Sequence, residues 1–134
     1  MRMIKAVVLA QLMIPVAHGG EIIVTIKSAP EICAPLMVGV FDKESFLGVP
    51  IYKERAESAA GAVVRFSAVS AGAYAVSAYC DNNRNGELDK GIFGRPIEPI
   101  GMSRNAKGRM GPPCFEDAAV VVGADPVDIS LTLR

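Results

Sequence analysis

A short polar segment in the second half of the chain carries the residues best suited to chemistry. Oxygen-bearing side chains occur at Asp81, Asn83, Asn85 and Asp89, and Gly86 stands where a loop backbone would have to turn sharply. This spacing matches positions one, three, five, nine and six of an EF-hand calcium loop, in which side-chain and backbone oxygens wrap the ion. The sequence therefore predicts a calcium site formed by the two aspartates and the two asparagines.

The match to an EF-hand loop is incomplete at its end. Position twelve falls on Ile92 where a bidentate glutamate is needed, and no helical pattern flanks the loop. Glu98 is the nearest acidic residue able to complete the shell. Because only two ligands are charged and Arg84 and Lys90 lie close in sequence, the expected calcium affinity is weak, on the order of 0.1 to 1 mM. A second interpretation stays open, in which the Asp and Asn side chains form turns with their own backbone and Gly86 has a positive φ.

The scaffold predicted around this loop is a set of short strands. Segments 21–27 and 62–69 are rich in β-branched residues or alternate between apolar and polar residues, and the end of the chain alternates from Val127 to Leu133. Segments 62–69 and 73–80 are expected to form a hairpin around Gly72. Segment 52–61 is expected to be a charged linker holding at most one helical turn. The other predicted strands are 36–41 and 118–122.

These elements predict an all-β fold, a small antiparallel β-sandwich of six or seven strands, transthyretin-like or Ig-like. A chain of 134 residues with 51% hydrophobic and 21% charged residues suits one packed core. The segment 81–114 is one long loop rich in Asp, Asn, Gly and Pro. So long a loop in a compact domain needs something to order it, and a bound cation would do so.

The N-terminus has the three parts of a secretory signal peptide. Arg2 and Lys5 precede an apolar run at 6–17, which ends near the small residues Ala17 and Gly19. Residues 1–19 are therefore predicted to be a signal peptide and residues 20–134 a single domain, exported to the periplasm or outside the cell and not spanning a membrane. Loss of the signal would leave 12 basic against 14 acidic residues, so no strong field recruits nucleic acid.

Three cysteines, Cys33, Cys80 and Cys114, occur in this exported chain, where disulfides persist. One pair is expected with one thiol left over, and the sequence leaves all three pairings open. Cys33 with Cys114 is the favoured pair, because both look like loop or strand-edge positions. Cys80 ends an apolar strand and is interpreted as a small buried apolar residue.

The leading functional expectation is a non-enzymatic binding or structural module with an unknown envelope or extracellular partner. The alternative is a hydrolase acting on glycan or peptide through Glu98 with Asp89 or Asp117, if two of these carboxylates lie roughly 5 to 10 Å apart. A third possibility is that the basic segment with Arg104 and Lys107 meets an anionic surface. Arg109 belongs to the same basic segment.

An ordered set of residues spans most of the chain from the fourth predicted strand onward. It comprises Gly72, Tyr74, Val76, Asp81, Asn83, Asn85, Gly86, Asp89, Phe93, Gly94, Pro96, Glu98, Gly101, Ser103, Asn105, Ala106, Gly111, Pro113, Phe115 and Ala118. With this set the chain closely resembles the uncharacterised bacterial domain-of-unknown-function family 2141 (DUF2141), from about Ile22 to the C-terminus. The resemblance implies an exported β-sandwich and no known activity.

The Gly-x-Tyr strand followed by the Asp/Asn/Gly loop is also similar, over a shorter stretch, to transthyretin-like domains and bacterial surface-adhesin repeats. That resemblance implies a structural calcium ion in the loop, since some of those domains carry one there. The chain departs from the DUF2141 pattern at Arg104, where asparagine is usual, and at Cys80, where histidine is common.

Overall fold

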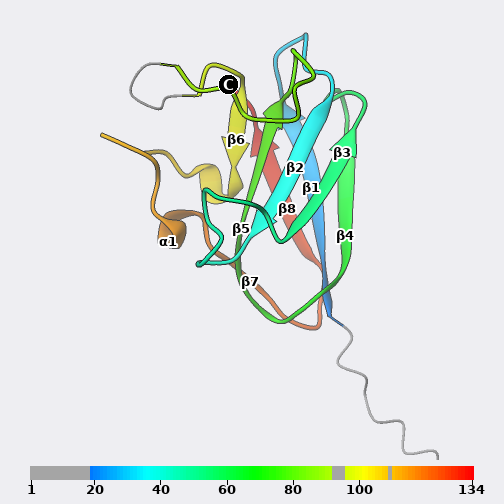
Figure 1. Cartoon of the computed structure of the whole chain (residues 1–134). Coiled ribbons are helices and arrows are strands. Elements are labelled where there is room, and N and C mark those ends of the chain that lie inside the picture. The colour runs from blue at the N-terminus through cyan, green and yellow to red at the C-terminus, as the bar shows by residue number, and fades with distance from the viewer. Residues whose placement is uncertain (1–18, 92–95, 109) are drawn as a thin grey trace, which may run out of the picture.

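The protein is a sandwich of two β-sheets in the computed structural model, which describes residues 19–91, 96–108 and 110–134 (Figure 1). One sheet has three strands in the order β4-β1-β8. The other has the order β3-β2-β5-β6, and β7 also pairs with β5. The strands are β1 (Gly20–Ser28), β2 (Leu36–Phe41), β3 (Tyr52–Ala56), β4 (Val63–Val69), β5 (Gly72–Cys80), β6 (Ile100–Met102), β7 (Val120–Val122) and β8 (Val127–Thr132), and α1 (Phe115–Ala118) is a single helical turn.

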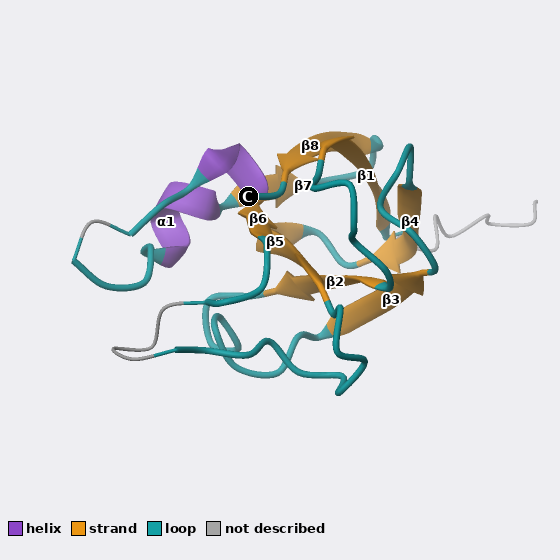
Figure 2. Ribbon diagram, turned by 90° about the horizontal axis from the view of Figure 1, so that it is seen from above, coloured by secondary structure: helices purple, strands orange, loops and turns teal. Residues whose placement is uncertain are grey.

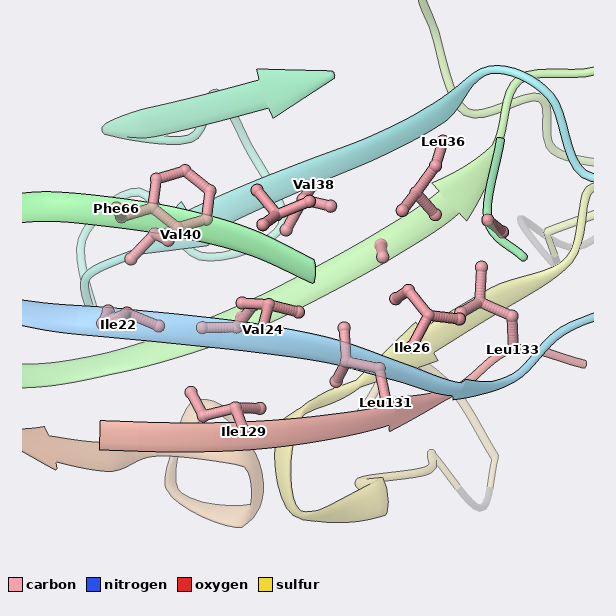
Figure 3. Close-up of a cluster of buried hydrophobic side chains, with 14 of the residues drawn as sticks. Ile22, Val24, Ile26, Leu36, Val38, Val40, Phe66, Ile129, Leu131 and Leu133 are labelled. Carbon is pink, nitrogen blue, oxygen red and sulfur yellow. The ribbon is translucent and has the colours of Figure 1, made fainter. Parts of the chain in front are cut away.

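Alternating side chains of the two sheets form the core between them. Ile22, Val24 and Ile26 of β1 are buried, and their neighbours Ile23, Thr25 and Lys27 on the other face are more exposed. Figure 3 shows the labelled core side chains of β1, β2 and β8 pointing into one common space. This period of two buries one face of each strand and leaves the other to solvent or to covering loops.

The two sheets are joined along the edge where β6 meets the end of the chain. Ile100 and Arg134 exchange two backbone hydrogen bonds, each 3.1 Å long. At Gly101 a Cβ would lie 2.5 Å from the carbonyl oxygen of Thr132, so only glycine permits this approach of β6 to the end of β8. The joint places the start of β6 beside the C-terminus.

The predicted all-β sandwich is confirmed, with several differences in detail. The segment 81–114, predicted to be one long loop, contains the strand β6 and a 3₁₀ helix at Ser103–Asn105. There are eight strands among the described residues, and β1 and β8 run parallel while the other pairs are antiparallel. Segment 52–61, expected to be a linker, contains the edge strand β3, paired with β2. Its charged residues Lys53, Glu54 and Arg55 are exposed, as suits an edge strand. A prediction based on apolar residues misses this strand because these three residues are charged.

The predicted hairpin is wrong. The strand β4 pairs with β1 and the strand β5 pairs with β2, so the short connection at Ser70 and Ala71 crosses from one sheet to the other. The hydroxyl of Tyr74 donates a 2.7 Å hydrogen bond to the carbonyl of Ser70 and holds this crossing. Alternation identified both strands correctly, but it carries no information on which strand each one pairs with.

The predicted signal peptide falls almost entirely on residues 1–18, which lie outside the described residues, and it stays a prediction. The first strand begins at Gly20, directly after the predicted signal segment. Among the described residues, no helix is long and apolar enough to cross a membrane.

Candidate functional site

The candidate site begins where β5 ends. Asp81 is 2% exposed, and its backbone N–H donates to the carbonyl of Pro35 at 2.9 Å. The preceding residue, Cys80, donates in the same way to Pro99 at 3.0 Å. Backbone hydrogen bonds on both sides therefore fix the first residue of the loop 81–89, hereafter the Asp81 loop, at one end of the sandwich (Figure 1).

The carboxylate of Asp81 organises the turn of this loop. Its Oδ1 accepts the N–H of Asn85 at 3.2 Å, and its Oδ2 accepts the N–H of Gly86 at 2.7 Å. Gly86 has a φ of 77°, the left-handed conformation that glycine adopts at little cost. Two hydrogen bonds leave lone pairs free on both carboxylate oxygens, because a carboxylate offers about four acceptor positions.

The other three predicted ligands converge above this turn. The side-chain N–H₂ groups of Asn83 and Asn85 each donate to one oxygen of Asp89, the second at 2.6 Å. The amide oxygens of the two asparagines accept backbone N–H groups within the loop, from Asn85 at 3.3 Å and from Glu87 at 3.0 Å. The structure thus brings Asn83, Asn85 and Asp89 together and contains the side-chain turns of the second interpretation.

Glu98 lies behind Asp89 and is the site's least satisfied group. It is 8% exposed, its Oε1 accepts the backbone N–H of Asp89 at 2.9 Å, and its buried Oε2 has no hydrogen-bond partner in the described part of the chain. The backbone of Ile97 also bonds to the carbonyl of Asp89 at 3.0 Å. A buried carboxylate oxygen without a partner is unfavourable and marks a place where a positive charge would be stabilised.

Tyr79 connects the loop to the sheet. Its hydroxyl donates a 3.0 Å hydrogen bond to the carbonyl of Gly86. Burial raises the pKa of Tyr79, and the nearby carboxylates, Asp81 first among them, raise it further because they disfavour a second negative charge. The phenol is therefore a neutral donor over the physiological range of pH.

This arrangement supplies oxygen ligands of the kind that calcium prefers. The charged candidates are the carboxylates of Asp81, Asp89 and Glu98, and the asparagine amides would present their oxygens to an ion only after turning. As the side chains stand, the described residues contain no group of three or more His, Cys, Asp or Glu side chains arranged to hold a metal. Ion binding thus requires the carboxylates of Asp81, Asp89 and Glu98 to move closer together and the exposed amides of Asn83 and Asn85 to rotate.

A disulfide fastens the base of the loop. Cys33 and Cys80 are bonded, with Cα atoms 4.8 Å apart, and Cys114 is an exposed free thiol. The favoured pairing of Cys33 with Cys114 is therefore wrong. Cys80 is buried, as expected, but its neighbour across the sheet is Leu36, which brings Cys33 beside it. The pairing becomes visible only once the register of β2 and β5 is known.

Asn82 adds a second tie at the same place. Its side chain donates to the carbonyl of Ile32 at 3.4 Å and accepts the N–H of Ala34 at 3.3 Å. Sequence reasoning overlooked Asn82 because it falls between the predicted ligands. It holds the Asp81 loop against the segment that carries Cys33.

The remaining candidate residues lie elsewhere. Asp117 belongs to α1, which packs on β5 near Ala75, while Glu98 lies near Cys80 at the other end of the strand. Five residues of strand separate those two levels by roughly 17 Å. The structure therefore does not bring Asp117 and Glu98 together, whereas Asp89 and Glu98 are neighbours.

The basic segment is also divided. Arg104 donates to the carbonyl of Glu116 at 3.0 Å and supports α1, and Glu116 forms a surface ion pair with Lys43 at 3.1 Å. A backbone hydrogen bond lowers the pKa of Glu116, and the pair with Lys43 lowers it further. Lys107 is exposed, and Arg109 lies outside the described residues.

Comparison with known proteins identifies the family. The family model described as "Uncharacterized protein conserved in bacteria (DUF2141)" matches residues 24–130. The chain belongs to this family. The match covers both sheets and the whole Asp81 loop, so the DUF2141 domain and the β-sandwich described above are the same unit. No curated protein and no solved structure gave a match.

Proposed function

We propose that this DUF2141 domain is an exported, non-enzymatic binding or structural module whose Asp81 loop is ordered by a calcium ion. The observation that carries the proposal is the buried Oε2 of Glu98, which has no hydrogen-bond partner among the described residues, while Oε1 of the same carboxylate accepts the backbone N–H of Asp89. Glu98 supplies the charged ligand that the EF-hand pattern lacks at position twelve, where Ile92 stands.

Charge balance favours a divalent cation here. Asp81 and Asp89 belong to the Asp81 loop and Glu98 accepts the backbone N–H of Asp89, so an ion that drew these three carboxylates together would satisfy the unpaired oxygen of Glu98. The amides of Asn83 and Asn85 are exposed, so they can turn their oxygens inward, and the loop hydrogen bonds lost by doing so are offset by ligation. Such an exchange agrees with an affinity on the order of 0.1 to 1 mM.

The disulfide supports the exported location. Disulfides persist in oxidising compartments and are rare in the bacterial cytosol. The Cys33–Cys80 bond lies beside the Asp81 loop and joins two buried sulfurs. A chain with such a bond suits the periplasm or the exterior, where millimolar calcium affinity is of use.

The burial of Glu98 favours a binding role over hydrolysis. A catalytic acid must touch its substrate, and a side chain that is 8% exposed beneath a loop is closed to a glycan or a peptide. Asp117, the other partner of the hydrolase alternative, lies at the far end of β5.

Thermal melts in calcium and in chelator test the proposal. With calcium at ten times the dissociation constant, binding adds about 1.4 kcal/mol, which raises the melting temperature by roughly 4 to 8 °C in a domain of this size. Glu98→Gln keeps the acceptor for the N–H of Asp89 and removes the charge, so it should abolish most of this rise. Asp125→Asn, in the exposed β7–β8 connection at the opposite end of the sandwich, is the matched control and should keep it.

Asp81→Ala is a poor test alone, because Asp81 also accepts two backbone hydrogen bonds and its loss destabilises the turn with or without calcium. An identical melting temperature in calcium and chelator for the unaltered protein would refute the metal site. The loop would then be a set of side-chain turns.

A further inference from the structure

A large cleft lies over the outer face of the five-stranded sheet, on the side away from the core. Its volume is about 1650 Å³, above the range of about 300 to 1,000 Å³ typical of ligand pockets. Figure 2 shows loops running beside β2 and β5 on this outer side, with the three-stranded sheet on the other. The loops that border the cleft are 46–50, 105–108 with 110–113, and the Asp81 loop.

The floor of the cleft is apolar and half-buried. Met37 and Phe41 of β2 and Ile100 and Met102 of β6 line it, and each keeps partial exposure to solvent. Unbranched thioether side chains adapt their shape to different apolar partners and are common at binding surfaces of broad specificity. The floor is thus suited to a flexible apolar ligand.

The apolar lining continues up one wall. Leu47 and Val49 are 47% and 80% exposed and both line the cleft. The loop that carries them is held close to the sheet, because Pro50 lies where a Cβ on Gly39 would be only 3.0 Å away. Solvent-exposed aliphatic side chains on a well-anchored loop beside an apolar floor indicate a binding surface.

The charged groups at the cleft are mostly positive. Lys53, Lys90, Lys107 and Arg134 line it and are exposed, and Glu87 is the acidic side chain among its described lining residues. The ion pairs found within the described residues involve other basic residues, so these three lysines are available to a ligand. The chain as a whole has no net positive charge, so the positive rim is a local feature. It favours the binding of a ligand with an anionic group.

We propose that this cleft binds a fatty acid, with the acyl chain on the Met37–Met102 floor and the carboxylate at the positive rim to which Lys53, Lys90, Lys107 and Arg134 contribute. The floor offers few hydrogen-bonding groups, because β2 and β5 each pair with a neighbouring strand on both edges. The hydroxyl of Tyr79 already donates to the carbonyl of Gly86. A peptide would leave its own backbone groups unsatisfied there, whereas an acyl chain has none to satisfy.

Calorimetric titration of the protein with decanoate tests the proposal. Decanol is the uncharged comparison, and chelator is present throughout because calcium precipitates fatty acids. Decanoate should bind, and decanol should bind at least fivefold more weakly. The triple variant Lys53→Gln, Lys90→Gln, Lys107→Gln should weaken decanoate binding at least tenfold and leave decanol unchanged, while Lys27→Gln, on the other sheet, should change neither.

A change to the floor gives an independent test. Met37→Asp places a charge on the apolar surface and should abolish the binding of both ligands, with circular dichroism confirming the fold. Val49→Asp, on the exposed wall, is the second variant if Met37→Asp does not fold, and it should weaken both ligands.

The proposal is overturned if the unaltered protein does not bind decanoate, if the triple variant binds it as tightly, or if an acidic peptide binds where decanoate does not. The Asp81 loop borders the cleft, but the two proposals are tested separately, since these titrations are calcium-free and the melts contain no fatty acid. Either can fail without the other.

Discussion

At the scale of single residues, substitutions at Gly86 can distinguish the free-energy cost of the turn from an effect on calcium binding. Gly86 and Gly61 both have positive φ, 77° and 66°, and a Cβ at either would meet open space. Alanine at either position should therefore cost only backbone strain, about 1 to 2 kcal/mol. Urea unfolding should give similar losses for Gly86→Ala and Gly61→Ala in chelator.

Only Gly86→Ala should also reduce the calcium-dependent rise in melting temperature, because Gly86 lies inside the Asp81 loop and Gly61 lies between β3 and β4. Equal calcium responses in the two variants would show that the conformation at Gly86 does not matter to the ion. A larger loss at Gly61 would contradict the argument from backbone strain.

Local spacing predicted much of this loop, and for a physical reason. Asx turns and calcium loops both depend on side chains two to five residues from the backbone groups they meet, so sequence spacing alone brings Asp81, Asn83 and Asn85 near one another. The isolated oxygen of Glu98 could not be predicted, because it depends on how residues nine positions apart fold back and on what is buried around them.

At the scale of elements, Ser103 joins three pieces of the fold. Its hydroxyl accepts the N–H of Val76 in β5 at 2.9 Å and donates to the carbonyl of Ala118 in α1 at 2.6 Å, and Ser103 itself begins a 3₁₀ helix after β6. It is fully buried. Ser103→Ala should leave two buried backbone groups unpaired and lower the free energy of unfolding by about 2 to 4 kcal/mol.

Urea unfolding measures this loss, and Ser130→Ala, on an exposed position of β8, is the control that should change stability little. Ser103→Cys, whose thiol is a weak donor and acceptor, should give an intermediate value. A Ser103→Ala loss as small as that of Ser130→Ala would mean that water replaces the hydroxyl.

Strand positions were predictable where alternation was strong and misread where it was not. The buried residues Ile129, Leu131 and Leu133 alternate with more exposed neighbours and defined the last strand closely. The charged β3 gave no such pattern, and the partners of β4 and β5 depend on contacts across the whole sandwich. Pairing is a tertiary property, and short-range sequence signals do not contain it.

At the scale of the whole molecule, the disulfide links the stability of the sandwich to the order of the Asp81 loop. It connects residues 47 apart in sequence and leads directly into Asp81. In the chain-entropy account, closing a loop of this length stabilises the native state by about 4 kcal/mol. Reduction should therefore lower the free energy of unfolding by about that amount and weaken the calcium response, since Asp81 loses its anchor.

Urea unfolding with and without a phosphine reductant measures the loss. The control is Cys114→Ser, which removes the exposed thiol and should leave both the stability and its dependence on reductant unchanged. Peptide mapping without reduction should recover Cys33 joined to Cys80. A Cys33–Cys114 peptide, or a Cys114→Ser protein that no longer responds to reductant, would contradict this pairing and with it the covalent base on which the loop is built.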